Sequence, residues 1–227
     1  MDFLKNVRED EEVGAGRMMN EEAYKSIIQM PQYMKEALKN LKLNGRLDKE
    51  IDRILIIGMG GSGIIGSIIE EWLEYSIRIP LITWKDYKLP NWCDKNTLVI
   101  AISYSGETEE TVTATMNAIK NGCRIAIVTS DGRLLKIADE GGIPYICIPK
   151  KFAQPREALP YLFIAVTKIL EEIGILNESV EEEIEETIEV LKEIHDKVLN
   201  EMRPRVIAER ILGKIITIYA YRPLRSA

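Results

Sequence analysis

The stretch IDRILIIGMGGSGIIG, residues 51–66, decides the fold because it joins two apolar runs through a cluster of glycines. A strand that leads into a helix through glycines presents free backbone N–H groups at the positive end of the helix dipole. Gly58, Gly60 and Gly63 also fit the pattern G-x-G-x-x-G, which is typical of dinucleotide-binding loops. The stretch therefore predicts an anion-binding turn. It leaves open whether the ligand is a dinucleotide or a smaller anion, or whether the turn binds nothing.

Short apolar runs rich in Ile and Val continue this pattern along the chain, each bounded by turn residues. Segments of helix length lie between most of them, at residues 64–75, 108–121 and 133–140. Strands that are apolar on both faces and alternate with helices form a parallel sheet that is covered on both sides. We therefore predict a doubly wound α/β domain at residues 45–152. Its strands are expected in the runs RILIIGM, IPLITWK, TLVIAIS, CRIAIVT and PYICIP.

Helical segments are predicted on both sides of this domain. Residues 1–44 are expected to form two short helices, with Asn20 as an N-cap and Pro31 as the interruption. Residues 153–212 are expected to form a helical connection, whose first helix is buried and ends at Gly174. The second helix has apolar residues along one face, namely Val180, Ile184, Ile188, Leu191, Val198 and Met202.

The last segment, residues 213–227, is predicted to start a second, truncated α/β domain. The run GKIITIYAY has the character of a buried strand, and RPLRSA resembles the loop that would follow it. A parallel strand normally needs a crossover helix, and the sequence stops before one. We therefore expect the chain to be a truncated form of a longer protein.

Composition excludes several classes of function. The 227 residues carry a formal net charge of −6, whereas a nucleic-acid groove needs clustered lysine and arginine to neutralise phosphates. No run of 18 apolar residues occurs and the first residues are charged, so we expect a cytoplasmic protein that binds neither membrane nor nucleic acid. Cys93, Cys123 and Cys147 lack C-x-x-C spacing and are expected to be free thiols in a reducing compartment.

A second candidate binding segment is TLVIAISYSGETEET, residues 97–111, where an apolar strand ends in a cluster of hydroxyl side chains. Ser103, Ser105 and Thr108 surround Gly106, and a helix is predicted to start near Thr108. Hydroxyl and backbone N–H donors at a helix start can bind a phosphate monoester without a lysine. Thr108 can also act only as a helix cap, a role that is compatible with binding. Because both segments follow carboxyl ends of parallel strands, a small phosphorylated molecule is the predicted ligand.

A dinucleotide fits these segments less well. Such a site needs an acidic residue about 20 positions after the glycines, at the end of the second strand, to bind the ribose hydroxyls. Asp86 lies near that position but beyond the apolar run. An NAD-dependent oxidoreductase is therefore a less favoured hypothesis than a protein that binds a small phosphorylated molecule.

Several motifs together resemble a known family. GMGGSGIIG followed by SYSGETEET resembles the sugar isomerase (SIS) domain, which has a flavodoxin-like fold and binds phosphosugars. More narrowly, the chain resembles the archaeal bifunctional phosphoglucose/phosphomannose isomerases through most of its length. The motifs that carry this resemblance are GMGGSG, KDYKLP, ISYSGETEET, IPKKFAQPREALPYLF and IYAYRPLRSA.

The resemblance implies where a phosphosugar binds. In that family, the residues that match Gly61 and Ser62 contact the sugar phosphate. The residues that match Ser103, Ser105 and Thr108 hold its phosphate group. These five residues are therefore the candidate substrate-binding residues.

The resemblance also implies a catalytic residue. The arginine of the QPR motif, here Arg156, is similar to one that lies beside the reacting C1 and C2 atoms. Its permanent charge and its fork of donors suit the stabilisation of an enediolate. A cation at a helix start is unfavourable without an anionic partner, which also argues against a purely structural role. Two positions depart from the family: Glu107 stands where Asn is frequent, and Ser67 where Asp is frequent.

The implied activity is an aldose–ketose isomerase that interconverts glucose 6-phosphate and mannose 6-phosphate with fructose 6-phosphate through a cis-enediol. The resemblance implies that this reaction needs no metal ion, cofactor or nucleotide. The family takes its base Glu, its ring-opening His and a C-terminal Lys from a second SIS domain, and no residue of this sequence matches them. His195, the only histidine, lies in the acidic predicted helix and is not assigned a role.

The resemblance further implies a homodimer with sites shared between subunits. Activity is therefore expected of the full-length gene product and not necessarily of this chain alone. An alternative from another class is a non-catalytic phosphosugar-binding module, which would bind fructose 6-phosphate without turnover.

Overall fold

The computed structural model describes residues 25–176, 180–200 and 203–221, and its centre is a parallel sheet in the order β2-β1-β3-β4-β5. This is the strand order of flavodoxin-like sheets and confirms the predicted doubly wound α/β fold. The strands are β1 Arg53–Ile57, β2 Leu81–Trp84, β3 Thr97–Ser103, β4 Arg124–Thr129 and β5 Tyr145–Cys147. The helices are α2 Met30–Asn40, α3 Gly60–Leu73, α4 Glu109–Lys120, α5 Gly132–Gly141, the 3₁₀ helix η2 Pro155–Ala158, α6 Leu159–Glu172, α7 Val180–Asn200 and α8 Arg203–Ile211.

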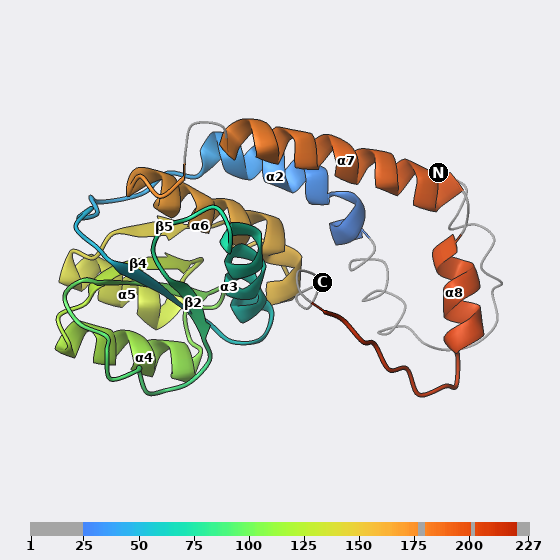
Figure 1. Ribbon diagram of the computed structural model, residues 1–227. Coiled ribbons are helices and arrows are strands. Elements are labelled where there is room, and N and C mark those ends of the chain that lie inside the picture. The colour runs from blue at the N-terminus through green and yellow to red at the C-terminus, as the bar shows by residue number, and fades with distance from the viewer. Residues whose placement is uncertain (1–24, 177–179, 201–202, 222–227) are drawn as a thin grey trace.

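Alternate residues of each strand face opposite sides of the sheet, and helices cover both sides. Ile54 and Ile56 of β1 belong to a core that α3 and α6 complete. Leu55 and Ile57 belong to a second core that α4 and α5 complete. Because the central strands β1, β3 and β4 are almost entirely buried, apolar residues line both of their faces, which is why a run of isoleucines forms a strand here. Figure 1 shows α6 above the sheet and α4 below it.

An outer helical layer covers α6. Helix α2 packs on α6, and α7 runs alongside α2 (Figure 1). The buried residues of α7 are Val180, Ile184 and Ile188, which confirms this part of the predicted apolar face. Leu191 is half-buried, and the side chains of Val198 and Met202 lie outside the part of the chain that the structure describes.

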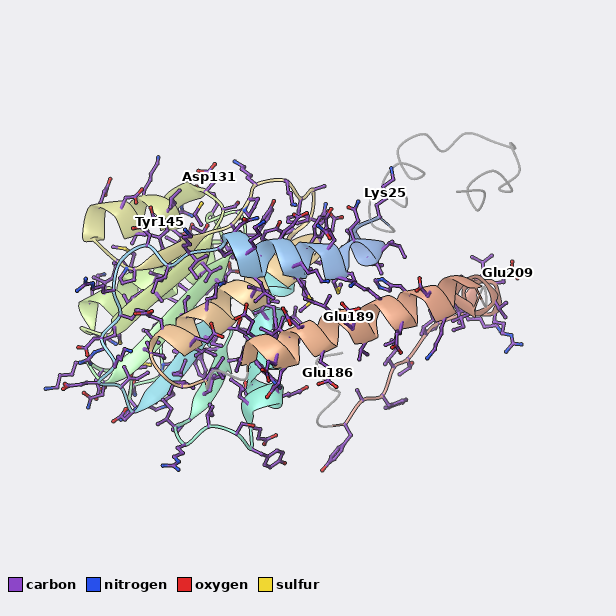
Figure 2. The ribbon with its side chains drawn as sticks, turned by 90° about the horizontal axis from the view of Figure 1, so that it is seen from above. Lys25, Asp131, Tyr145, Glu186, Glu189 and Glu209 are labelled. Carbon is purple, nitrogen blue, oxygen red and sulfur yellow. The ribbon has the colours of Figure 1, made fainter. Side chains whose placement is uncertain are left out.

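Helix α7 reaches beyond the sheet. Figure 2 shows Glu186 and Glu189 on α7 and Glu209 beyond it in α8. One ion pair, from Lys35 of α2 to Glu189 at 3.3 Å, joins the two outer helices. Past this point Val190 and Ile194 are about half exposed. In the described residues, no helix has both the length and the apolar surface needed to cross a bilayer.

The N-terminal helical segment breaks where the sequence predicts. Residues 25–28 are helical, the chain turns at Gln29, and α2 begins at Met30 with Pro31 in its first turn. Proline is tolerated there because the first N–H groups of a helix have no intrahelical partner. The predicted N-cap Asn20 lies outside the described residues.

The predicted strand in GKIITIYAY is wrong. Residues 215–221 form no strand, and Ile215 and Tyr219 are 99% and 92% exposed. Figure 1 shows this segment as an extended arm that follows α8 and runs back towards the α/β domain. The apolar pattern reflects strand character, but a strand also needs a neighbour for its backbone groups, and none of the five described strands pairs with it. The RPLRSA tail, residues 222–227, lies outside the described residues.

Candidate functional site

The turn between β1 and α3 is built around close backbone contacts that only glycine allows. A Cβ atom at Gly63 would lie 2.4 Å from the carbonyl oxygen of Gly58. Gly60 has a φ of +52°, a conformation that other L-residues rarely adopt. The glycines thus fold the turn tightly under the start of α3.

The start of α3 leaves backbone donors free. Met59 occupies the N-cap position in extended conformation and makes no side-chain cap. The N–H groups of Ser62 and Gly63 donate to the carbonyl of Met59 at 3.1 and 3.0 Å. The N–H groups of Gly60 and Gly61 have no partner among the described residues. Free N–H groups at the positive end of a helix dipole attract an anion.

The turn between β3 and α4 gathers the predicted hydroxyls. The Ser103 hydroxyl lies 3.0 Å from that of Thr108 and accepts a hydrogen bond from the N–H of Gly106 at 3.2 Å. Ser105 is exposed, and its hydroxyl oxygen accepts from the N–H of Glu107 at 3.3 Å. Thr108 is the N-cap residue of α4 but forms no side-chain cap. The interpretation of Thr108 as a simple helix cap is therefore wrong.

The two turns lie against each other. The backbone N–H of Tyr104 donates to the Ser62 hydroxyl at 3.2 Å, which ties the start of α3 to the end of β3. A Cβ atom at Gly58 would lie 3.0 Å from the carbonyl oxygen of Ile102. The contact brings Ser62 next to Ser103, with Gly61 beside Ser62 in the chain. One edge of the sheet therefore carries two adjacent helix starts, neither of which has a side-chain cap.

Arg156 approaches the same edge from the other end of the sequence. It lies in η2, and a Cβ atom at Gly61 would be only 2.9 Å from the Arg156 backbone nitrogen. Gln154 and Glu157 form a capping box at the start of η2. The Arg156 side chain is exposed and has no hydrogen bond or ion pair with another described residue. The structure thus brings Arg156 beside the start of α3 with its guanidinium available.

The segment before Arg156 is anchored to α2 by Lys151, which the sequence analysis did not single out. The Lys151 ammonium lies 3.0 Å from the Glu36 carboxylate and 4.3 Å from the ring centroid of Tyr33. Glu36 also accepts a hydrogen bond from the Tyr161 hydroxyl at 2.7 Å. The bonds from Tyr161, Lys151 and Gln32 lower the pKa of the Glu36 carboxyl from 4.5 to about 2.

Tyr104 links that anchored segment to the hydroxyl turn. Its hydroxyl donates to the carbonyl of Phe152 at 3.1 Å and accepts from the Phe152 N–H at 2.8 Å. Tyr104 therefore connects the turn after β3 to the segment that carries Arg156. The middle residue of the SYS motif acts as a structural bridge, while its two serines stay in the turn.

The start of α5 differs from the starts of α3 and α4 because its donors are occupied. The N–H of Gly132 donates to the Asp131 carboxylate at 2.8 Å, and the N–H of Arg133 donates to the Glu107 carboxylate at 2.9 Å. The next N–H, that of Leu134, donates to the carbonyl of Gly106 at 3.1 Å. Glu107 thus caps α5. This role explains why an acidic residue is present in a turn that is predicted to bind phosphate.

Arg133 is a second residue that the sequence analysis missed. Its guanidinium donates to the carboxylate and carbonyl of Glu107 at 2.9 and 3.0 Å and to the Glu109 carboxylate at 2.6 Å. The signal was available, because an arginine at a helix start is unfavourable unless an anion accompanies it. Arg133 stands at such a helix start, and Glu107 and Glu109 are its anionic partners.

Two other residues weighed from the sequence lie elsewhere or are already engaged. The Asp86 carboxylate accepts a hydrogen bond from the N–H of Lys88 at 3.3 Å, within its own turn after β2. His195 is in α7, part of the outer helical layer in Figure 1. The geometry thus adds nothing in favour of a ribose-binding Asp86 or a catalytic His195.

Comparison with known proteins agrees with this geometry. Residues 49–134 match the model of the SIS domain. The chain is 35% identical over 204 residues to a bifunctional phosphoglucose/phosphomannose isomerase of Caldicellulosiruptor bescii, covering 88% of this chain and 58% of that protein. It is 39% identical over 171 residues to the Aquifex aeolicus protein of the same name, covering 74% and 49% respectively. The chain thus spans between 49% and 58% of the length of these two relatives.

Solved structures share the fold at lower sequence identity. The C-terminal domain of glucosamine-fructose-6-phosphate aminotransferase from Francisella tularensis has a TM-score of 0.57 at 17% identity, covering 83% of this chain and 58% of that one. A candidate phosphosugar isomerase from Clostridium difficile 630 has a TM-score of 0.60 at 20% identity, covering 83% and 56%. The predicted similarity to bifunctional phosphoglucose/phosphomannose isomerases is confirmed, and so is the predicted SIS domain, whose model matches residues 49–134.

Proposed function

We propose that this chain is the phosphosugar-binding part of an aldose–ketose isomerase that interconverts glucose 6-phosphate and mannose 6-phosphate with fructose 6-phosphate. One observation carries the proposal. Two helix starts without side-chain caps, those of α3 and α4, adjoin at the carboxyl edge of the sheet, and the free Arg156 lies beside them. The named relatives support the same reaction.

The phosphate group is proposed to bind between the two helix starts. The N–H groups of Gly60 and Gly61 would donate from one side, and the hydroxyls of Ser103, Ser105 and Thr108 from the other. Hydrogen bonds to a charged group each contribute about 1.5–3 kcal/mol, so a few such donors bind a dianion without any lysine. Ser62 holds the turns together through Tyr104 and has a hydroxyl hydrogen left to donate.

Arg156 is proposed to act on the reacting carbons. Isomerisation moves a proton from C2 of the aldose to C1 through a cis-enediolate, and the negative charge that develops on the two oxygens needs stabilisation. A guanidinium presents paired donors that fit two adjacent oxygens. We assign no base in this chain. The base and the ring-opening acid are proposed to come from residues outside this sequence, so catalysis is a property of the full-length gene product.

The direct test measures both turnover and binding. Full-length protein should form fructose 6-phosphate from glucose 6-phosphate and from mannose 6-phosphate in a coupled assay, and Arg156→Gln should lower kcat at least a hundredfold with little change in KM. Folded full-length protein that shows no turnover would overturn the isomerase. If fructose 6-phosphate still raises the Tm of that inactive protein, a binding module is the better description.

A homodimer in the cytoplasm completes the proposal. The exposed apolar residues support further contacts with another chain or domain, namely Val190, Ile194, Val206, Ile207 and Leu212. The three free cysteines support a reducing compartment. Light scattering on the full-length protein should give twice the monomer mass, and a monomer at micromolar concentration would contradict the dimer.

A further inference from the structure

Arg133 binds the turn that contains Thr108 from both sides of that residue. Its guanidinium contacts Glu107, which precedes Thr108, and Glu109, which follows it. The backbone N–H of Arg133 donates to the same Glu107 carboxylate. Four hydrogen bonds of 2.6–3.0 Å thus join one residue of α5 to the start of α4.

The carboxylates near Thr108 pose an electrostatic problem for the proposed ligand. Glu107 precedes Thr108, and Glu109 and Glu110 follow it, in a turn that is proposed to hold a phosphate dianion. At 4 Å, two unit charges interact by about 4 kcal/mol at the effective dielectric of a protein surface, so uncompensated carboxylates would strongly oppose binding. In the described residues, Arg133 is the cation that ion-pairs with Glu107 and with Glu109.

Stability alone does not account for this arrangement. The Arg133 side chain is 43% exposed, and exposed ion pairs contribute little to the free energy of unfolding. The starts of α4 and α5 are already joined by the hydrogen bond from the Leu134 N–H to the Gly106 carbonyl. The feature that depends on Arg133 is the charge and the position of the turn beside Thr108.

We propose that Arg133 is a positioning residue of the phosphate site, which holds the 107–109 turn and cancels the charge of Glu107 and Glu109 so that a phosphate dianion binds at the start of α4. The inference rests on the proposed function. Arg133 acts through the turn and does not itself contact the ligand. A glutamate at position 107 is tolerated in this chain because Arg133 accompanies it.

The test compares charge variants by calorimetric binding of fructose 6-phosphate to the 227-residue chain. Arg133→Gln should weaken binding at least tenfold at low salt, and the loss should shrink as ionic strength rises because screening weakens the repulsion. Adding Glu107→Gln and Glu109→Gln to Arg133→Gln should restore most of the affinity, because it removes the two negative charges. The glutamine at position 107 can still accept the hydrogen bond from the backbone N–H of residue 133. Glu109→Gln alone should strengthen binding, and this variant tests the inference even if Arg133→Gln folds poorly.

A matched control removes an arginine from the opposite edge of the sheet. Arg53 is the first residue of β1 and pairs with Asp52 at 2.6 Å, so Arg53→Gln changes the net charge equally but far from the site. It should leave the affinity unchanged. If Arg133→Gln binds as the unaltered chain does, or loses affinity without salt dependence and without rescue by the two glutamines, the inference is overturned.

Inorganic phosphate separates this inference from the proposed function. If the unaltered chain binds inorganic phosphate but not fructose 6-phosphate, the proposed function fails, and the Arg133 variants are compared with phosphate as the probe. If the folded chain binds neither, both proposals fail. If it binds both and Arg133→Gln has no effect, only the role of Arg133 fails.

Discussion

The starts of α4 and α5 look alike in sequence but differ in what occupies their backbone donors. Each follows a buried strand, and each has a glycine at positive φ, Gly106 at +70° and Gly132 at +81°. The start of α5 is closed by Asp131, Glu107 and the Gly106 carbonyl. The start of α4 has no side-chain cap, although Thr108 stands at the N-cap.

The difference shows that a glycine turn before a helix is an anion site only where its donors stay free. The start of α3 resembles that of α4, because Met59 provides no side-chain cap. Two open helix starts therefore adjoin, while the third is filled by the protein's own carboxylates. A monophosphate matches this arrangement, and the predictions that follow test it from the largest expected effect to the smallest.

The largest effect should come from Gly106, where the α4 and α5 starts meet. A Cβ atom there would lie 1.7 Å from the carbonyl oxygen of Asp131, at a φ that already disfavours a side chain. We expect Gly106→Ala to lower the free energy of unfolding by more than about 3 kcal/mol, measured by urea denaturation. Gly122 is the matched control, because it shares a φ of +70° but has open space around it. Gly122→Ala should lower the free energy of unfolding by about 1–2 kcal/mol. Equal losses at both glycines would contradict the close approach of Gly106 to the Asp131 carbonyl.

Ser105→Asp should act on binding and not on folding. Ser105 is exposed in the open turn, so a carboxylate there meets the proposed phosphate directly. We expect affinity for fructose 6-phosphate to fall at least about a hundredfold, about 2.8 kcal/mol, in a calorimetric titration. The Tm without ligand should stay within about 2 °C. Undiminished binding would place the phosphate elsewhere.

The two N-cap positions should respond differently to alanine. Asp131→Ala removes a carboxylate that accepts the Gly132 N–H, so the Tm should fall by about 2–4 °C. Thr108→Ala removes no cap and only the hydroxyl contact with Ser103, so the Tm should fall less than in Asp131→Ala while the affinity for fructose 6-phosphate falls. Calorimetric unfolding and binding of both variants give the comparison. The reverse pattern, with Thr108→Ala the less stable, would show that α4 is the capped helix.

The smallest effect should appear in acid, at the anchor of the Arg156 segment. The folded pKa of Glu36, about 2, lies below the unfolded value of 4.5, so the carboxylate stabilises the fold fully above pH 4.5. That contribution is lost as the pH falls from 4.5 towards 2. The Tm difference between the unaltered chain and Glu36→Gln should therefore be greatest near neutral pH and shrink across this range. A Tm difference that stays constant with pH would show that the charge of Glu36 does not contribute to stability.

Much of the fold could be predicted because it depends on local pattern. The runs of β1, β3 and β4 are apolar on both faces, and only a sheet covered by helices buries both faces. The glycine turn after β1 and the hydroxyls after β3 were predicted from the residues themselves, whereas Gly61 and Ser62 were implied by the resemblance to the isomerase family. Their phosphate contacts stay a prediction.

What could not be predicted depends on contacts between distant residues. Glu107 caps a helix that begins 25 residues later, a pairing that follows only from the adjacency of β3 and β4. Lys151 meets Glu36 across 115 residues. The strand expected in GKIITIYAY was wrong for the same reason, since strand character is local but a strand's hydrogen-bonding partner is not.

The most direct measurement is a ¹H–¹⁵N NMR titration of the chain with fructose 6-phosphate, because it reports on each helix start separately. The largest shifts should fall on the amides of Gly60, Gly61, Thr108 and Glu109, which have no partner among the described residues, while the amide of Gly132 stays bonded to Asp131 and shifts little. Largest shifts at the start of α5, or none at the starts of α3 and α4, would contradict the proposed phosphate site.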